Sequence, residues 1–489
     1  MASSPAVNFS ADVVDRTDRG DRALVEIRRD GTRREWTFGE VADRSARLAG
    51  ALVARGIGRG DVVMTLIGNR PEWVLTMVAC FRIGAVVLPC NEQLRAKDLR
   101  QRVDAAQPKL IVTDERNADE LVAAAPDEMR MRMILIPDLS LFDHEPAPAV
   151  DLRLTDPCLI TFTSGTTGEA KGIVHGQRYL PGQQLQASRW LDARPGDLVW
   201  CTAASGWSKS ARNVFIAPWI NGAAALLHDH RFDPHQRLAI LAAEQVNVLC
   251  MAPTEYRVIA KRADLTPVPS LHALVAAGEA LNPEVLRAFQ EGMGLDIRDG
   301  YGQTETGQLT GVPAGGAVRP GSMGQPLPGV RLEVVDGELV LADPRTDPTF
   351  FVAYLDGERA PEDEPWHTGD HVQRDDDGYL YFEGRADDVI ISAGYRIGPF
   401  EVESALVSHG AVAEAAVVAA PDDERGAVVR AVVVLRDGFG PSDALVTELQ
   451  DHVKRETAPY KYPRIVEFAD DLPKTASGKV QRALLRGAS

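Results

Sequence analysis

One short loop in the sequence gathers the residue types that bind phosphate groups. Between residues 163 and 172 it holds hydroxyl side chains, glycines and Lys171, and the apolar run 158–162 before it predicts a buried strand. Glycines let the backbone approach a ligand and turn its N–H groups inward, while hydroxyls and lysine add donors and charge. The loop therefore suits the phosphates of a nucleotide, with a surface turn between two strands as the alternative. It is not a Walker A loop, because Ala170 precedes the lysine and Gly172 follows it.

Three further blocks follow this loop along the chain. They are Tyr301-Gly-Gln-Thr-Glu305, Thr368-Gly-Asp370 and Pro473-Lys-Thr-Ala-Ser-Gly-Lys479. Together with the loop, and in this order, they resemble the adenylate-forming superfamily of acyl-CoA synthetases, adenylation domains and luciferases. The resemblance covers nearly the whole chain. It is closest to the medium-chain acyl-CoA synthetases, on residues 301–307, 391–403 and 460–475.

Composition limits the class of protein. The chain has 489 residues, is 45% hydrophobic and carries a net charge of −17, which argues against nucleic-acid and anionic-membrane partners. The five cysteines are odd in number and lack a CxxC pair, so we expect small core residues in a reducing compartment rather than disulfides or a metal cluster. No signal peptide and no bilayer-spanning run is visible, so we expect a cytoplasmic protein without membrane insertion.

The order of expected elements predicts an α/β fold. Strands at 61–67, 85–88, 110–112 and 133–136 alternate with helices that begin at Thr37 and Pro71, and the pattern resumes after the phosphate loop at 198–201, 223–227, 246–250 and 274–278. Residues 331–341 predict a β-hairpin with a type I′ turn at Asp336-Gly337. We expect a large N-terminal domain of several subdomains with layered parallel and mixed sheets (1–384), a hinge (385–388) and a small mobile α+β domain (389–489).

The resemblance implies an ATP-dependent carboxylic acid:CoA ligase acting on a medium-chain fatty or aromatic acid. The carboxylate would attack the α-phosphate of ATP to give acyl-AMP and pyrophosphate, and the CoA thiol would then displace AMP. The substrates and cofactors implied are the acid, ATP, Mg²⁺ and coenzyme A. Between the two steps the C-terminal domain would swing about a hinge at Asp387, since hinges absorb backbone rotation over a few residues.

The same resemblance implies the nucleotide site. The loop with Lys171 would hold the β- and γ-phosphates, and Thr304 would donate to a phosphoryl oxygen. Glu305, with Thr167, would ligate Mg²⁺, which prefers oxygen ligands. Asp370 would accept both ribose hydroxyls beside Arg385. The full set is Thr163, Ser164, Gly165, Thr166, Thr167, Gly168, Lys171, Gly278, Glu279, Asp299, Gly300, Tyr301, Gly302, Gln303, Thr304, Glu305, Asp370 and Arg385. A solvated acid at Glu305, and a surface ion pair for Asp370 or Arg385, are the alternatives.

Lys479 is the predicted catalytic cation. It lies in a Gly-bearing loop near the terminus and would neutralise charge on the carboxylate and the α-phosphate during adenylation. A solvated lysine in a tail is the alternative. Lys474 lies in the same loop and could be taken for the catalytic lysine, but the family pattern favours Lys479 for this role.

The CoA tunnel and the acyl pocket are implied in the same way. The resemblance assigns Ala393, Gly394, Tyr395, Arg396, Arg425, Arg464 and Gln93 to CoA, and Trp207, Gly278 and Gly302 to the acyl pocket. Acetate-specific relatives carry tryptophan at the position of Gly302, so glycine there resembles enzymes for longer or aromatic acids. Trp207 is equally compatible with a core tryptophan. Lys209 and Arg212 are unusual for an apolar tunnel, and the sequence leaves open whether they face CoA or pair with a polar acid.

Three other functions remain open at this point. The first is a stand-alone adenylation enzyme that loads a carrier protein. The second is a non-catalytic nucleotide-binding relative, against which the presence of Glu305, Asp370 and Lys479 argues. The third is a luciferase-like oxygenase. A homodimer is also left open.

Overall fold

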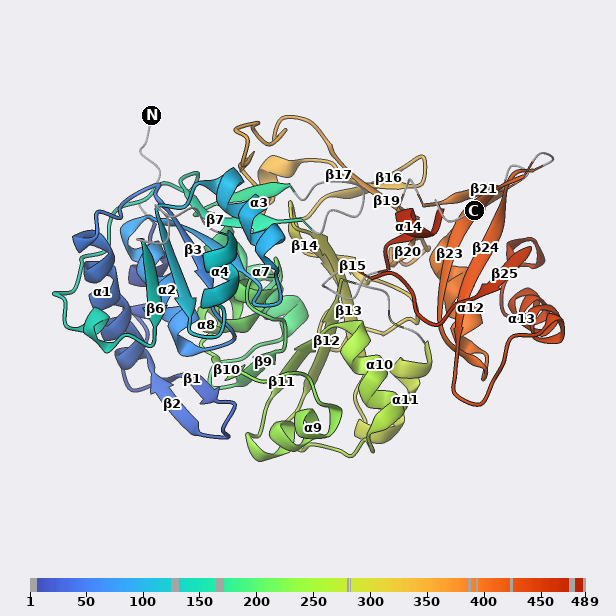
Figure 1. The fold of residues 1–489 in the computed structure, drawn as a ribbon, viewed down its shortest axis with the longest axis horizontal. Helices are drawn as coiled ribbons and strands as arrows, with labels where there is room; N and C mark the ends of the chain where they lie inside the picture. The colour runs from blue at the N-terminus through green and yellow to red at the C-terminus, as the bar shows by residue number, and fades with distance from the viewer. Residues whose placement is uncertain are drawn as a thin grey trace.

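The computed structural model describes residues 7–124, 132–163, 171–278, 281, 283–385, 388–392, 395–422, 425–474 and 480–486, without the side chain of residue 396. Figure 1 shows a large body that contains the first two sheets, followed by a smaller unit at the C-terminal end. The predicted fold class, a large layered α/β domain with a small α+β domain, is confirmed. None of the helices in the described part of the chain combines the length and hydrophobicity needed to cross a bilayer.

A seven-stranded sheet carries the phosphate loop. Its order is β18-β8-β7-β4-β3-β5-β6, with β7 parallel to β4 and β8 antiparallel to β7. The strands are β3 (Val62–Leu66), β4 (Val86–Cys90), β5 (Leu110–Asp114), β6 (Met133–Ile136), β7 (Pro157–Phe162), β8 (Gly172–Gly176) and β18 (Ala353–Tyr354). The helices in this part of the chain are α1 (Phe38–Ala54), α2 (Pro71–Ile83), α3 (Ala96–Ala106) and α4 (Ala118–Ala124), with a 3₁₀ turn at Leu139–Phe142. The predicted helix start is confirmed, because Thr37 and Glu40 form a capping box.

A nine-stranded sheet carries most of the other predicted site residues. Its order is β15-β14-β13-β12-β11-β9-β10-β1-β2, and the strands from β13 to β1 are parallel. The strands are β1 (Arg22–Ile27), β2 (Arg33–Thr37), β9 (Leu198–Cys201), β10 (Ala224–His228), β11 (Val248–Met251), β12 (Ala273–Ala277), β13 (Ile297–Gln303), β14 (Gly307–Gly311) and β15 (Gln325–Pro326). The associated helices and helical turns are η1 (Ser10–Val14), α6 (Tyr179–Gly182), α7 (Gln184–Gln186), η3 (Ala187–Leu191), η4 (Arg212–Ile216), α8 (Ala217–Ile220), α9 (Pro234–Ala243), α10 (Pro253–Arg262) and α11 (Pro283–Met293).

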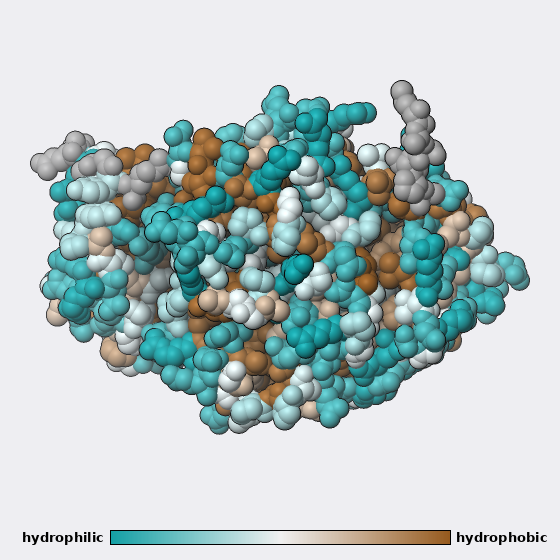
Figure 2. Space-filling model, turned by 180° about the vertical axis from the view of Figure 1, so that it is seen from behind, coloured by the Kyte–Doolittle hydropathy of each residue, from teal (hydrophilic) through white to brown (hydrophobic). Residues whose placement is uncertain are grey.

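Aromatic side chains join these two sheets into one core. Trp73 of α2 meets Phe215 of η4 edge-on, with ring centroids 5.8 Å apart, and Phe215 meets Trp219 of α8 at 5.0 Å. Their cluster also contains buried residues of both sheets, such as Val87 and Val199. Such pairs add to the free energy of burial, so they help to hold the two sheets together. The face in Figure 2 is largely hydrophilic, with smaller hydrophobic areas between the polar side chains.

A four-stranded antiparallel sheet follows, in the order β16-β17-β19-β20. It is built from β16 (Leu332–Val335), β17 (Glu338–Leu341), β19 (Trp366–Arg374) and β20 (Leu380–Arg385), with a 3₁₀ turn at Pro344–Thr346. The predicted hairpin is confirmed as β16–β17, and both Asp336 and Gly337 have positive φ, as a type I′ turn requires.

The C-terminal unit has its own sheet and cores. It contains β21 (Ile390–Ser392), β22 (Tyr395–Ile397), α12 (Pro399–Ser408), β23 (Val412–Asp422), β24 (Gly426–Leu435), α13 (Asp443–Glu456), a 3₁₀ turn at Pro459–Lys461, β25 (Ile465–Phe468) and α14 (Arg482–Arg486). Its two hydrophobic clusters draw only on residues from 390 onward. The unit follows directly on β20 and packs closely against it. A Cβ on Gly398 would come within 2.4 Å of the Glu383 carbonyl oxygen, so glycine is needed at this contact.

Candidate active site

A buried carboxylate, Asp370, lies where the nine-stranded and four-stranded sheets meet. Its side chain accepts hydrogen bonds at Oδ2 from the Tyr301 hydroxyl and from Gln303 Nε2 (2.9 Å), both on β13. At Oδ1 it accepts one from Arg385 Nη1 (3.1 Å), on the neighbouring strand β20. A carboxylate has about four acceptor positions. The three protein donors therefore leave Oδ1 with capacity for a further hydroxyl donor.

The neighbours of Asp370 are fixed by their own hydrogen bonds. Gln303 Nε2 also donates to the Thr368 carbonyl (2.6 Å), and Gln303 Oε1 accepts from Trp366 Nε1 (3.0 Å). Gly369 has a φ of 68°, and a Cβ there would lie 3.1 Å from Arg385 Nη2. Glycine is therefore needed in the Thr-Gly-Asp turn for both backbone conformation and space.

The carboxyl of Glu305 is influenced by the charges of Lys171 and of the Asp370–Arg385 pair. Burial raises the pKa of the Glu305 carboxyl above its ordinary value, and the positive charges of Arg385 and Lys171 counteract that rise. Lys171 is exposed, with Nζ 5.3 Å from the centroid of the Tyr354 ring. Its backbone closes the base of the phosphate loop, because Thr163 N–H donates to the Lys171 carbonyl (2.9 Å).

The described residues are compatible with magnesium at Glu305. No group of three or more potential metal ligands occurs in the described ranges. Mg²⁺ characteristically takes one or two protein carboxylates and completes its shell with water and substrate phosphates. A single half-buried carboxylate beside a phosphate loop fits that pattern, because the nucleotide would supply the remaining oxygens.

Asp299 and its neighbours form the other side of the site. Asp299 is 7% exposed, and burial raises the pKa of its carboxyl well above the ordinary value, while the Gly300 N–H and the Lys209 charge lower it. Gly300 N–H donates to Asp299 Oδ1 at 2.8 Å. A Cβ on Gly300 would lie 2.3 Å from Gln308 Nε2, so glycine is required for this close approach.

Gly302 has a structural role that the resemblance did not indicate. A Cβ at this position would lie 1.8 Å from the Gly307 carbonyl oxygen, across the β13–β14 hairpin. No side chain fits there without movement of the hairpin. Glycine at 302 is therefore explained by strand closure alone, and it does not by itself report the length of an acyl pocket.

Sequence reasoning missed His175, a buried residue under Thr304. Its ring lies near the backbones of Thr304 and Thr349 and 4.1 Å from the Tyr179 ring, and its buried Nδ1 has no hydrogen-bond partner. Burial lowers the pKa of His175 to about 3, with the Arg212 charge as the second cause. Trp366 and Tyr354 were also missed. Trp366 stands four residues before Asp370 in a Trp-His-Thr-Gly-Asp run, which could have drawn attention to it.

The described residues assigned to CoA lie apart from this cluster. Tyr395 is 51% exposed and stacks on Tyr460 with ring centroids 4.3 Å apart. Arg464 is exposed and donates to the Tyr462 hydroxyl at 2.7 Å, while Arg425 is half-buried beside the turn between β23 and β24. Gln93 is exposed after β4. Within the described ranges, no hydrogen bond or ion pair links Tyr395, Arg425, Arg464 or Gln93 to Asp370 or Glu305.

Several predicted site residues fall outside the described part of the chain. They are Ser164, Gly165, Thr166, Thr167, Gly168, Glu279, Asp387, Ala393, Gly394 and Lys479, and for Arg396 only the backbone is described. Trp207 is half-buried, and this is compatible with both a pocket wall and a core position.

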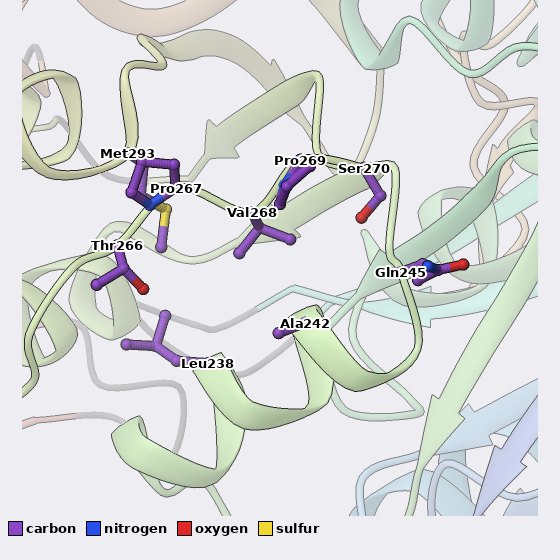
Figure 3. Close-up of a pocket in the computed structure, with 9 residues that line it drawn as sticks. All are labelled: Leu238, Ala242, Gln245, Thr266, Pro267, Val268, Pro269, Ser270 and Met293. Carbon is purple, nitrogen blue, oxygen red and sulfur yellow. The ribbon is translucent and has the colours of Figure 1, made fainter.

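A cavity of about 180 Å³ lies elsewhere on the nine-stranded sheet. Figure 3 shows it between α9 and the loop 266–270, with Met293 at one side. These residues precede β12 and β13, whereas Gly278 and Gln303 lie at the opposite, carboxyl ends of those strands. Ligands of α/β sheets bind at the carboxyl ends. We therefore do not assign this cavity to the active site.

Comparison with known proteins agrees with the motifs. Residues 11–345 match the family model "AMP-binding enzyme" and residues 401–479 match "AMP-binding enzyme C-terminal domain". The chain is 39% identical to the uncharacterized acyl-CoA ligase YtcI of Bacillus subtilis, over 95% of this chain and 92% of that protein. It is 39% identical to the mitochondrial acyl-coenzyme A synthetase ACSM4 of Homo sapiens, over 98% and 90%.

A solved structure extends this agreement to the fold. It is the o-succinylbenzoate CoA synthetase (MenE) of Bacillus subtilis in complex with its acyl-adenylate intermediate. The TM-score is 0.84 at 27% identity, over 100% of this chain and 99% of that one.

Proposed function

The chain belongs to the AMP-binding enzyme family and is an ATP-dependent acyl-CoA ligase, and from that premise we propose its acid and its residue roles. The acid is a medium-chain aliphatic or an aromatic carboxylic acid. In the first half-reaction a carboxylate oxygen forms a bond to the α-phosphorus of ATP and pyrophosphate leaves. In the second, the CoA thiolate attacks the acyl carbonyl, the thioester forms and AMP leaves.

The convergence of Tyr301, Gln303 and Arg385 on Asp370 is the observation that carries the residue assignment. It joins the buried carboxylate of the Thr-Gly-Asp block, which has acceptor capacity remaining, to the Tyr-Gly-Gln-Thr-Glu block. A ribose, whose hydroxyls are donors, suits that carboxylate. The adenosine would then lie at the carboxyl end of β13.

The phosphates would lie between β13 and the phosphate loop. Lys171 and the loop residues would hold the β- and γ-phosphates, and Thr304 would donate to the α-phosphate. Mg²⁺, when bound, neutralises phosphate charge, and Glu305 would hold it together with Thr167. Lys479 would bring its charge to the reacting carboxylate and α-phosphate. Positioned charges and donors supply most of the rate in such reactions.

The C-terminal unit would serve both half-reactions. We propose residues 1–384 as the adenylation domain, 385–388 as the hinge and 389–489 as the lid that carries Lys479. After adenylation the lid would rotate and bring the CoA-side residues, from Ala393 to Arg396 with Arg425 and Arg464, toward Gln93.

ATP–pyrophosphate exchange tests this function directly. A panel from acetate to medium-chain fatty acids, with benzoate and hydroxybenzoates, should give acid-dependent exchange, and CoA should convert the same acids to thioesters. Lys479→Ala should slow exchange by about 10²–10³-fold, by analogy with loss of one oriented donor, and Lys474→Ala is the matched control. Exchange without thioester would indicate a carrier-protein acceptor. Exchange at a near wild-type rate in Lys479→Ala would remove the lysine assignment.

Compartment and assembly remain predictions. We propose a cytoplasmic enzyme without nucleic-acid or membrane partners, to be checked by cell fractionation. Whether it forms a homodimer is decided by light scattering on the purified protein.

A further inference from the structure

Two basic side chains lie near the predicted acyl pocket, Lys209 beside Gly278 and Arg212 beside Gly307, the residue that Gly302 meets across the hairpin. Lys209 lies in the turn that follows β9, and Arg212, three residues later, begins η4. Lys209 Nζ donates to the Ala277 carbonyl (2.8 Å) and lies 3.2 Å from where a Cβ of Gly278 would stand. Arg212 Nη1 lies 3.5 Å from where a Cβ of Gly307 would stand, across the hairpin from Gly302.

The Arg212 guanidinium is buried, and no described residue provides it with a counter-charge. Its residue is 5% exposed, and Nε has no hydrogen-bond partner. Among the described carboxylates, none lies within 4.0 Å of Arg212 or of Lys209. The polar neighbours of Arg212 are the Tyr179 hydroxyl and the His175 ring, and its charge opposes the burial-driven rise in the pKa of Tyr179. A buried cation that lacks an anion is strongly unfavourable. A bound carboxylate would supply a counter-charge for this cation.

Polar groups on residues next to Arg212 and Gly307 in the sequence, or bonded to such residues, also lack partners. Gln186 Oε1, Asn213 Nδ2 and Gln308 Oε1 are buried without hydrogen bonds, although Gln186 Nε2 donates to Asn213 Oδ1 at 3.0 Å. Gln308 adjoins Gly307, and its Nε2 lies against Gly300. An alkyl chain would leave every one of these groups unsatisfied. A carboxylate, which only accepts hydrogen bonds, suits the two donors among these groups, Arg212 Nε and Asn213 Nδ2, whereas the acceptors Gln186 Oε1 and Gln308 Oε1 need a donor instead.

We propose that the acid is a dicarboxylic acid, activated at one carboxylate while Arg212 binds the other and Lys209 supports it. Arginine is suited to this role because its planar fork can bind a carboxylate through two parallel hydrogen bonds. The inference rests on the proposed function and narrows its substrate class. Arg212 and Lys209 are specificity-determining residues, and the reacting carboxylate lies at the other end of the acid, toward Thr304.

Length-matched acids test the proposal. ATP–pyrophosphate exchange is measured with hexanoate and adipate, octanoate and suberate, and benzoate and isophthalate. We expect kcat/KM for each diacid to exceed that of its monoacid by at least about tenfold in the wild type. Arg212→Met should lower the ratio of diacid to monoacid kcat/KM by at least about 100-fold, since the second carboxylate loses its buried partner. Lys209→Met should lower the ratio less, and the exposed Arg231→Met is the matched control.

The outcomes separate this inference from the function on which it rests. Exchange that favours the monoacids, or an unchanged ratio in Arg212→Met, would overturn the inference and leave the ligase intact. No exchange with any acid would overturn the proposed function and the inference together. Thermal melting with and without ATP shows whether Arg212→Met folds. If Arg212→Met does not fold, the proposal is still tested by the ratio of diacid to monoacid kcat/KM in the wild type and in Lys209→Met, whose side chain is half-exposed.

Discussion

Asp370 joins two parts of the chain through hydrogen bonds that only a carboxylate can accept in full. In Asp370→Asn the amide nitrogen would face the donors Tyr301 and Gln303 or the guanidinium of Arg385. Each hydrogen bond to a charged group contributes about 1.5–3 kcal/mol. We expect kcat/KM for ATP in the exchange reaction to fall by about 10–100-fold, mainly through KM, because ribose binding precedes chemistry.

The control for Asp370→Asn is the exposed neighbour Asp376→Asn, in the turn between β19 and β20. An unchanged KM for ATP in Asp370→Asn would show that this carboxylate does not contact the nucleotide, whatever the fate of kcat.

His175 makes stability depend on pH. Its pKa is about 3 in the folded chain and about 6.5 when unfolded. Between these values the unfolded chain binds one more proton, so stability rises with pH and is lost as pH falls below about 6.5. One proton corresponds to a slope of at most about 1.4 kcal/mol per pH unit. Urea unfolding at pH 7, 6 and 5 should show a shallower slope for His175→Gln than for the wild type.

The exposed His235→Gln is the control, and it should keep the wild-type slope. Equal slopes in all three proteins would mean that His175 is accessible to protons in the folded state.

At the scale of elements, the sequence predicted those features, such as helix starts and tight turns, that depend on residues close together in the chain. The helix start at Thr37 and the turn at Asp336-Gly337 depend on neighbouring residues, and both are as predicted. The pairing of β1 with β10, some 200 residues apart, has no local signal. For the same reason the sequence could not show that Tyr301 meets Asp370, or that Arg212 is buried with no carboxylate partner among the described residues.

The segment after β20 is the predicted hinge. β20 ends at Arg385, and residue 387 lies outside the described part of the chain. Proline fixes φ near −65°, so it restricts the rotation that a hinge must allow. Asp387→Pro should leave ATP–pyrophosphate exchange within about threefold of wild type and reduce thioester formation by at least about 100-fold, the loss that misplacing reacting groups can cause. Single-turnover assays of the two half-reactions measure this.

Asp387→Ala is the matched control, since it removes the same carboxylate while keeping backbone freedom. Equal losses in both half-reactions of Asp387→Pro would contradict a hinge role.

At the scale of the molecule, the chain consists of units with separate cores. The two clusters of the C-terminal unit contain no residue before Ile390, whereas the first cluster unites both large sheets. A unit of about 100 residues with its own core is large enough to fold alone. We therefore expect two calorimetric transitions in the full chain. A chain that ends at Arg385 should keep one of them, because its sheets and clusters are complete without the lid.

The truncated chain also separates binding from catalysis. It retains Asp370, Tyr301, Gln303 and Arg385, so ATP should bind with a Kd within about tenfold of the full chain, as measured by calorimetry. It lacks Lys479, so exchange should fall at least as far as in Lys479→Ala, about 10²–10³-fold. Thioester formation should be lost, because the assigned residues from 393 onward are absent. ATP binding that disappears in a folded 1–385 chain would instead place essential nucleotide contacts on the lid.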